Sequence, residues 1–185
     1  MNKRILILSG SPRKGGNSET LCAEFTRGAE ESGHTVEMVR LHGKKMGFCT
    51  ACYACKKTGQ CVQKDDVAEI LDKMAQADCI VLSTLVYFYQ MNAQMKTLID
   101  RTMACYYDER LSGKEFCFIV TAAEDKPALE RTMDGLPGAK ISGLIYGAAR
   151  GSWEKSRETP PCSRPIRWEK KSVNFDPDIK RSRRP

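Results

Sequence analysis

The chain has 185 residues, of which 41% are hydrophobic and 29% charged, with a formal net charge of +7. This length suits one domain whose core needs no disulfide support. No apolar stretch approaches the roughly 20 residues of a membrane helix, and the apolar run near the N-terminus is too short for a signal peptide. We therefore expect a cytoplasmic protein with reduced thiols.

The positive charge gathers at the end of the chain. Residues 150–185 contain 11 Lys and Arg against 5 Asp and Glu, whereas residues 1–149 contain 19 against 18. The nearly neutral main part gives no sign of nucleic-acid binding. Residues 150–185 are rich in proline and lack an apolar period, which predicts an irregular or disordered basic tail. We expect a domain at 1–149 followed by this tail.

Short apolar runs alternate with amphipathic stretches along the main part of the chain. Strands are predicted at 5–8, 36–41, 79–82, 116–120 and 140–146, and helices at 17–32, from 65 to about 74, at 93–107 and at 126–133. The segment that follows 36–41, and residues 84–92, are predicted as loops. Strands alternating with helices indicate a parallel sheet with helices on both faces. Five such strands without a GxGxxG motif favour an α/β, flavodoxin-like fold in three layers, with strand order 2-1-3-4-5.

Ligands of such sheets bind at the carboxyl ends of the strands, so the loops after the first, third and fourth strands are candidates. The first of these loops contains hydroxyls, glycines and cations and leads into a helix N-terminus, which favours phosphate binding. It lacks the spacing of an ATP-binding P-loop, and an ordinary turn is the alternative. The candidate phosphate ligands are Ser9, Ser11, Pro12, Arg13, Asn17, Ser18 and Thr20.

Two segments resemble one family of oxidoreductases. GSPRKGGNSETL at 10–21 resembles the FMN-phosphate loop of the NADPH-dependent FMN reductase-like proteins, and STLVYFYQMNAQMKTLIDR at 83–101 resembles their flavin-ring loop and the following helix. The resemblance implies FMN as cofactor and NAD(P)H as a possible co-substrate. It places the flavin ring along Thr84, Leu85, Val86, Tyr87 and Phe88, with Leu85 standing where the family usually has proline; core packing is the alternative for the two aromatic residues. By position alone, Thr121, Ala122 and Glu124 fall in a third flavin loop.

Four cysteines follow the spacing C-x2-C-x2-C-x5-C, at Cys49, Cys52, Cys55 and Cys61. Clustered thiolates select zinc or iron–sulfur clusters, but structural zinc sites usually place two C-x2-C pairs on separate turns. The motif, followed by two aspartates, resembles that of the iron–sulfur flavoproteins, in which one [4Fe–4S] cluster accompanies FMN in homodimers or homotetramers. The resemblance implies that the four cysteines are cluster ligands; zinc and metal-free thiols are the alternatives.

The remaining chemistry-bearing residues have structural interpretations. Asp65 and Asp66 are expected to cap a helix, and Asp100 and Arg101 to form surface ion pairs. No catalytic side chain is predicted, because a flavin carries the redox chemistry itself. The isolated cysteines in apolar surroundings are expected to be inert core residues: Cys22, Cys79, Cys105 and Cys117.

The tail allows one further hypothesis. A DNA string that encodes Pro161 to Lys171 also encodes MQPAYKMGK when it is translated two bases later, and this peptide resembles the usual last helix of the family. The tail would then be a frameshifted translation, and its basic charge would have no functional meaning.

Together these features predict an FMN-dependent electron-transfer flavoprotein in which a [4Fe–4S] cluster relays electrons to FMN. Its partners would be small-molecule or redox-protein electron donors and acceptors, without nucleic acid or membrane. Two alternatives stay open at this stage. One is an NAD(P)H-dependent FMN or quinone reductase without a cluster, and the other is a zinc-stabilised, non-enzymatic binding module on the same fold.

Overall fold

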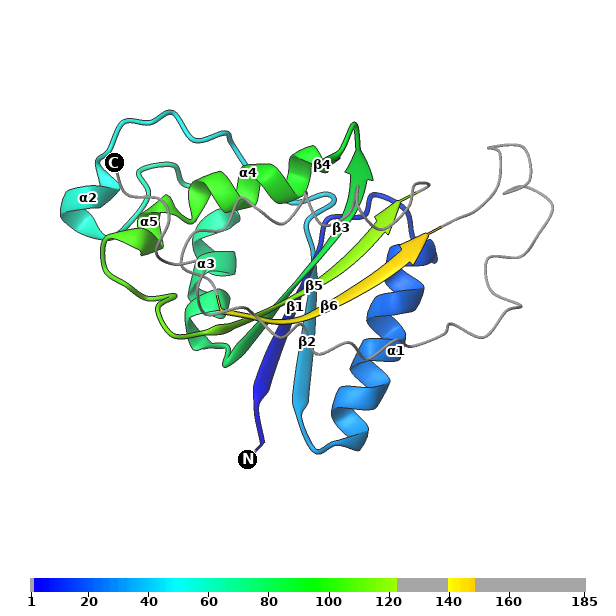
Figure 1. The fold of residues 1–185 in the computed structure, drawn as a ribbon. Coiled ribbons are helices and arrows are strands. Elements are labelled where there is room, and N and C mark those ends of the chain that lie inside the picture. Colours follow the sequence, from blue (N-terminus) through cyan, green and yellow to red (C-terminus); the bar gives the residue numbers. More distant parts are fainter. Residues whose placement is uncertain (1, 123–139, 149–185) are drawn as a thin grey trace, which may run out of the picture.

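The computed structural model describes residues 2–122 and 140–148 (Figure 1). The predicted helix at 126–133, the candidate Glu124 and the tail at 150–185 lie outside these residues. The elements follow one another as β1 (Arg4–Ser9), α1 (Asn17–Glu31), β2 (Thr35–Arg40), α2 (Cys55–Thr58), α3 (Val67–Gln76), β3 (Cys79–Tyr87), β4 (Gln90–Met91), α4 (Ala93–Arg101), α5 (Met103–Tyr106), β5 (Glu115–Ala122) and β6 (Lys140–Ala148).

The parallel strands form one sheet in the order β2-β1-β3-β5-β6, and the short β4 pairs antiparallel with β3. Counted along the parallel strands alone, this is the predicted order 2-1-3-4-5, and the flavodoxin-like prediction is confirmed. The register places Ser9, at the end of β1, opposite both Arg40 of β2 and Ser83 of β3. Three strands therefore deliver their following segments to the same edge of the sheet.

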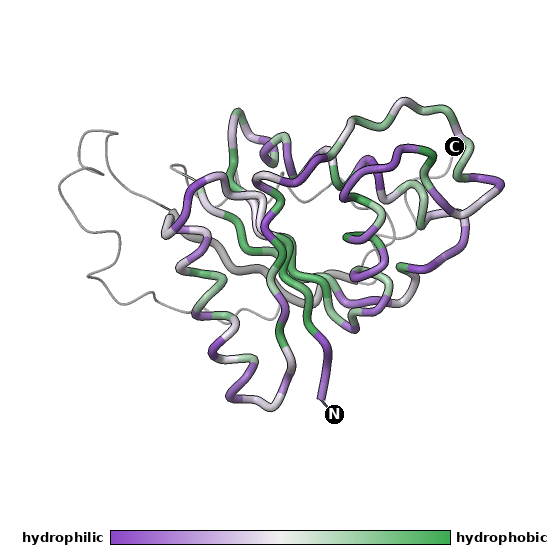
Figure 2. Tube along the Cα trace, turned by 180° about the vertical axis from the view of Figure 1, so that it is seen from behind, coloured by the Kyte–Doolittle hydropathy of each residue, from purple (hydrophilic) through white to green (hydrophobic). Residues whose placement is uncertain are grey.

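Two hydrophobic cores cover the two faces of the sheet. Successive side chains of a strand point to opposite faces. Leu6 and Leu8 accordingly pack in the core under α3 and α4, while Ile5 and Ile7 pack in the core under α1. Figure 2 shows the hydrophobic residues gathered in the central strands, between helices of mixed character. A strand buried on both faces is typical of a parallel sheet, and it gives the edge that carries the loops a rigid base.

The structure corrects the predicted loop at 84–92. β3 continues to Tyr87 and turns back into β4, because Thr84, Val86 and Tyr87 are β-branched or aromatic residues that favour extended backbone. The backbone N–H of Asn92 donates to the carbonyl of Leu85 at 3.1 Å and closes this hairpin.

Three smaller predictions also change. The helix predicted at 93–107 ends at Arg101 and is followed by α5, because the Thr102 hydroxyl donates to the carbonyl of Ile99 at 2.7 Å and competes for a helical acceptor. The cysteine-rich loop contains one helical turn, α2. The N-cap of α1 is Gly16 rather than Asn17 or Ser18. Among the described residues, no helix has the length and apolar character needed to cross a membrane.

Candidate functional site

The segment from Ser9 to Thr20, called the phosphate loop here, joins β1 to α1. No side chain caps the start of α1, and the first N–H groups of a helix lack intrahelical partners. Ser9 Oγ is buried and has no hydrogen-bond partner among the described residues. Unpaired donors at a helix start, beside a buried hydroxyl, suit the phosphate of a nucleotide.

A carboxylate that the sequence did not single out fixes the shape of this loop. Glu19 accepts a hydrogen bond from the backbone N–H of Gly15 and pairs with Arg40 at the end of β2. Gly15 has φ +66°, a conformation that favours glycine. The arginine offsets the negative charge that Glu19 would otherwise add beside a bound phosphate.

Asn92 ties the phosphate loop to the hairpin after β3. Its side-chain amide donates to the carbonyl of Gly10, and its Oδ1 accepts from the Thr84 hydroxyl at 3.0 Å. Asn92 is only 1% exposed. A Cβ at position 10 would lie 2.6 Å from Asn92 Oδ1, so the close approach of the two loops requires glycine there. Sequence reasoning placed Asn92 in a loop and missed this role.

The third candidate loop is joined to the first by a pair of hydroxyls. Ser18 Oγ and Thr121 Oγ1 lie 2.7 Å apart, and both residues are buried. Thr121 lies near the end of β5. The next residue, Ala122, which was also predicted to belong to the third flavin loop, is half-buried. The three loops predicted to hold a flavin are therefore connected by hydrogen bonds at one edge of the sheet.

The hairpin between β3 and β4 carries three aromatic residues in a row, and we call it the aromatic hairpin. Tyr87 and Tyr89 are half exposed, and Phe88 is 97% exposed. Phe88 and Tyr89 have φ values of +51° and +63°, which bulky residues rarely adopt. The core-packing alternative for Tyr87 and Phe88 is wrong, because both side chains face away from the core; Leu85 and Val86 are half-buried.

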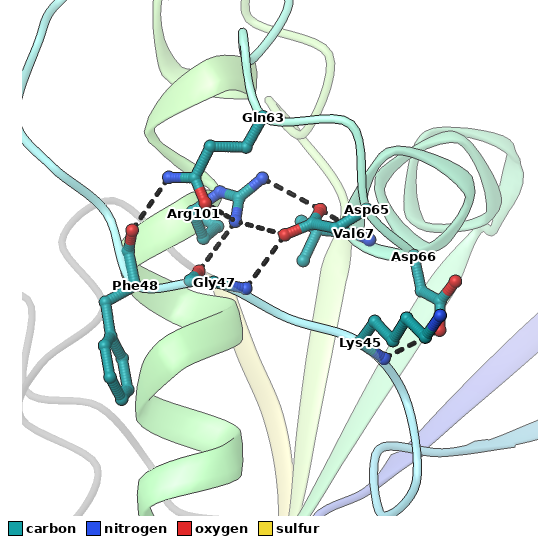
Figure 3. Close-up of polar contacts among 8 residues, drawn as sticks. All are labelled: Lys45, Gly47, Phe48, Gln63, Asp65, Asp66, Val67 and Arg101. Atoms are coloured by element: carbon teal, nitrogen blue, oxygen red, sulfur yellow. Dashed lines mark hydrogen bonds and ion pairs between the residues drawn. The ribbon is translucent and has the colours of Figure 1, made fainter.

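The four clustered cysteines lie in a segment that leaves the sheet after β2 and returns at α3. We call residues 46–65 the cysteine segment. Two hydrogen bonds close its neck. The backbone N–H of Asp66 donates to the carbonyl of Lys45 at 3.0 Å. The N–H of Lys45 donates to Asp66 Oδ2 at 2.8 Å (Figure 3). Asp66 therefore closes the neck, and its carboxylate does not cap α3 as predicted.

All four cysteines line one pocket, of about 80 Å³, together with Arg101 and residues of α5. Cys49 and Cys52 are exposed, whereas Cys55 and Cys61 are half-buried and pack against the core. Among residues 2–122 and 140–148, no group of three or more Cys, His, Asp or Glu side chains is arranged as a metal site. The donor set nevertheless fits a thiolate-ligated group, because four soft ligands share one pocket.

Arg101 holds both flanks of the cysteine segment (Figure 3). Its guanidinium forms two hydrogen bonds with Asp65, Nη1 to Oδ2 at 2.8 Å and Nη2 to Oδ1 at 3.0 Å. Nη1 also donates to the carbonyl of Gly47 at 2.7 Å and to Gln63 Oε1 at 3.1 Å. Gln63 in turn donates to the carbonyl of Phe48 at 2.8 Å.

The side chain of Arg101 is 1% exposed, so the predicted surface ion pair is wrong for this residue. Asp100 does form a surface pair, with Lys96 at 2.5 Å. Partial burial opposes ionisation of Asp65, but hydrogen bonds from Arg101 and from the N–H groups of Gly47 and Val67 outweigh it and hold the Asp65 pKa below its ordinary value. The pair is thus fully charged at neutral pH.

A second arginine supports the far end of the cysteine segment. Arg110 Nη2 donates to the carbonyl of Gly59 at 2.5 Å, and its Nε pairs with Asp108 at 2.6 Å. Gly59 has φ +67° and ends α2, the helical turn that begins at Cys55. The backbone around Cys55 is therefore anchored independently of Arg101.

The isolated cysteines lie mainly in the cores. Cys22, Cys79 and Cys105 are buried and Cys117 is half-buried. Burial raises the pKa of Cys22 and of Cys105 and keeps both as unreactive thiols. Cys79 Sγ lies 3.9 Å from Cys117 Sγ, and this contact, with burial, raises the Cys79 pKa.

The predicted flavin-binding residues differ in exposure. Ser9, Ser11, Ser18, Thr84 and Thr121 are buried, Pro12 and Thr20 are half-buried, and Arg13 and Asn17 are exposed. The buried hydroxyls share the edge of the sheet with Gly10 and Asn92. These last two residues were not among the site residues predicted from the sequence. Their assignment as FMN ligands stays a prediction.

The fold defines the class, an α/β protein of flavodoxin-like architecture whose candidate loops share one edge of the sheet. Residues 3–139 match the family model described as NADPH-dependent FMN reductase. The chain belongs to this family of flavin-dependent oxidoreductases.

Curated relatives carry a more specific name. An iron–sulfur flavoprotein of Methanocaldococcus jannaschii is 41% identical over 130 residues, which cover 70% of this chain and 67% of that protein. An iron–sulfur flavoprotein of Archaeoglobus fulgidus is 39% identical over 112 residues, or 60% of this chain and 50% of that protein. The chain thus spans between half and two thirds of these relatives.

Solved structures support the fold. The NAD(P)H:quinone oxidoreductase from Methanothermobacter marburgensis superposes with a TM-score of 0.65 at 18% identity, over 80% of this chain and 83% of that one. A flavone reductase superposes with a TM-score of 0.59 at 23% identity, over 78% and 54%.

Proposed function

We propose that the protein is an electron-transfer flavoprotein that binds FMN across the phosphate loop, residues 84–88 and residues 121–124, and a [4Fe–4S] cluster on Cys49, Cys52, Cys55 and Cys61. Flavin accepts one or two electrons and an iron–sulfur cluster carries one, so the two groups together can couple one-electron donors to two-electron acceptors. Membership of the FMN reductase family and the names of the curated relatives support the proposal.

The observation that carries the proposal is the shared pocket of the four cysteines. In the described residues, other cysteines are scattered through two cores, whereas these four meet around one space beside a buried cation. Thiolate ligands carry negative charge, and Arg101 at the wall of the pocket offsets part of it.

The chain's own residues have defined parts in this function. The start of α1 and the buried hydroxyls would bind the phosphate, and Asn92 would keep the phosphate loop and the aromatic hairpin at a fixed spacing. The exposed rings of the aromatic hairpin would cover the flavin and exclude water. No side chain is assigned to proton transfer.

The proposal extends to the setting of the protein. Reduced cysteine ligands suit the cytoplasm, and the electron donors and acceptors would be small molecules or redox proteins. We further propose a homodimer or homotetramer, with residues 1–149 as the flavin-binding domain and residues 150–185 outside it.

One experiment separates this function from its alternatives. The full chain is purified without oxygen, its visible spectrum is recorded, and flavin, iron, acid-labile sulfide and zinc are assayed. The proposal expects flavin with about four iron and four sulfide per chain. Flavin without iron, bleached rapidly by NAD(P)H alone, would instead indicate a cluster-free reductase, which the family description favours. Zinc without flavin would indicate a binding module.

Matched cysteine variants complete the experiment. Cys61→Ser removes a proposed ligand and should abolish iron and sulfide while flavin stays bound. Cys22→Ala changes a buried cysteine of the opposite core and should leave the iron content unchanged. Equal iron loss in both variants would contradict the assignment of the ligands.

A further inference from the structure

Helix α4 runs between the two candidate sites. Its N-terminal neighbour, Asn92, is bonded to Gly10 and Thr84, which belong to the flavin-binding loops. Its last residue, Arg101, is bonded to Gly47, Gln63 and Asp65, which flank the cysteines. From Asn92 to Arg101 the chain makes nine residue steps, which rise by about 14 Å as a helix. One rigid element therefore has a polar anchor at each end.

The guanidinium of Arg101 is buried, and both of its terminal nitrogens have hydrogen-bond acceptors. The side chain is 1% exposed and bonds to a carboxylate, a backbone carbonyl and a side-chain amide. These acceptors lie on both sides of the cysteine motif, at Gly47 before Cys49 and at Gln63 and Asp65 after Cys61. One guanidinium thus fixes the two flanks of the motif, which lie 36 residues (Asp65) and 54 residues (Gly47) from Arg101 in sequence.

The glycine at position 47 supports the same conclusion. A Cβ there would overlap Gln63 Oε1, so the close approach of the two flanks requires glycine at position 47. Gly47 also donates its N–H to Asp65 Oδ2 at 2.9 Å. The base of the segment is consequently held by paired contacts and not by the arginine charge alone.

Stability alone is a weak explanation for this arrangement. Removing an arginine from water is costly, and replacing a buried ion pair by apolar residues of similar size is often neutral or stabilising. A buried pair that reaches two separate backbone flanks does something that apolar residues cannot do, because it fixes where those flanks lie.

We propose that Arg101 is a positioning residue for the cysteine segment, and that α4, anchored at Asn92 and Arg101, sets the placement of the cysteines relative to the flavin-binding loops. The part of this inference that concerns a loaded cluster rests on the proposed function; the part that concerns the cysteine segment itself does not.

A second consequence follows from the charge of Arg101. Arg101 and Cys61 line the same pocket, so a permanent positive charge lies beside one of the proposed ligands. A nearby cation favours the more negative, reduced state of a thiolate-ligated centre. Loss of the charge should therefore lower the midpoint potential of that centre.

The first test uses the full-length chain after treatment with a chelator, so that it does not depend on a cluster. The rate of iodoacetamide modification is measured at each cysteine by mass spectrometry. In Arg101→Gln, Cys61 should react about tenfold faster, because the flank beside it opens more often, whereas Cys55, whose backbone is held by Arg110, should change less. Asp100→Asn, which removes an exposed pair on the same helix, should react as the wild type does.

The opposite anchor provides a reciprocal variant. Asn92→Ala should weaken FMN binding about tenfold, measured by quenching of flavin fluorescence, through the loss of buried hydrogen bonds. It should leave the alkylation rates unchanged. Arg101→Gln should change FMN affinity less than about twofold, since the anchors do not share partners.

A double variant separates positioning from folding. Arg101→Met combined with Asp65→Leu removes both buried charges and should unfold near the wild-type temperature. Its cysteines should still react faster, because the carbonyl of Gly47 has lost its donor. Wild-type alkylation rates in this variant, or in a folded Arg101→Gln, would overturn the proposal.

The second test uses the reconstituted protein. Arg101→Lys retains the charge but not the planar fork, so its midpoint potential should stay closer to the wild-type value than that of Arg101→Gln, which should be lower. Identical potentials in all three would refute the electrostatic effect. A wild type that binds neither iron nor FMN would refute the proposed function and leave the alkylation result to be judged by itself.

Discussion

Arg101 illustrates how a residue can be misjudged from sequence. Its neighbour Asp100 lies in an exposed pair with Lys96, and the dipeptide as a whole suggests a charged surface. The spacing Met95, Leu98, Arg101 places the arginine on the buried face of α4, three residues after a core leucine. The signal was therefore present, but the partner that makes burial possible, Asp65, is 36 residues away.

The Arg101–Asp65 pair predicts a specific dependence of stability on pH. Because folding lowers the Asp65 pKa, the pair contributes stability above the unfolded-state pKa of about 3.9, and this contribution is lost as pH falls through the folded-state value. Asp65→Asn should be less stable than wild type by about 3–5 kcal/mol at neutral pH, since it leaves a buried cation without its counter-charge.

Urea unfolding across the pH range measures this effect. The gap in midpoint between wild type and Asp65→Asn should be constant down to about pH 5 and should narrow below about pH 4. Asp100→Asn serves as the control, with a midpoint close to wild type throughout. A gap that does not change with pH would contradict the role assigned to the ionised carboxylate.

At the scale of elements, the aromatic hairpin combines an unfavourable turn with exposed rings. Two-residue hairpin turns with positive φ at both positions favour Asn-Gly, whereas this turn is Phe88-Tyr89. Such conformations cost L-residues roughly 1–2 kcal/mol each. Strained backbone at the loop proposed to cover the flavin is what selection for function over stability would produce.

Replacing the turn tests this trade-off. Phe88→Asn combined with Tyr89→Gly should raise the free energy of unfolding by about 1–2 kcal/mol and should weaken FMN binding, because the rings that would cover the flavin are gone. Thermal unfolding and flavin titration measure the two effects. Tyr106→Ser, which removes another exposed ring outside the hairpin, should leave FMN affinity unchanged. Tighter FMN binding by the hairpin variant would contradict the assignment.

Most elements could be predicted because they depend on local pattern. The runs at 5–8, 79–82 and 116–120 lie inside β1, β3 and β5, and the alternation of strands and helices indicates the parallel sheet, whose order the count of five strands without a GxGxxG motif then favours. The arrangement of the site could not be predicted in the same way. Asn92 reaches Gly10, and Ser18 reaches Thr121, across 82 and 103 residues of sequence, and no local period indicates such contacts.

At the scale of the whole molecule, bound FMN should couple to stability. A ligand present at a hundredfold excess over its dissociation constant stabilises the folded state by about 2.7 kcal/mol, which corresponds to roughly 5–10 °C in unfolding temperature for a chain of this size. Riboflavin lacks the phosphate that the start of α1 would bind, so it should give a clearly smaller shift at equal concentration.

Thermal scans of the full chain with each flavin measure the difference. Ser18→Ala keeps the helix but removes a buried hydroxyl at its start, and it should reduce the FMN shift more than the riboflavin shift. Equal shifts with FMN and riboflavin would contradict a phosphate site at this edge. The difference between the FMN and riboflavin shifts should persist at moderate salt. Salt screens non-specific attraction between the FMN phosphate and the basic residues 150–185, so this condition controls for such attraction.

The closed neck between Lys45 and Asp66 has a consequence for the history of this protein. The residues at its two ends are joined directly by one backbone hydrogen bond and by one bond from the Lys45 N–H to the Asp66 carboxylate. Closing a loop of this length adds little entropic cost over closing a shorter one. A gene that discarded the entire thiol-bearing insert in one event would therefore also have to lose the buried Arg101 charge, because the partners of that charge, Gly47, Gln63 and Asp65, all lie within the insert.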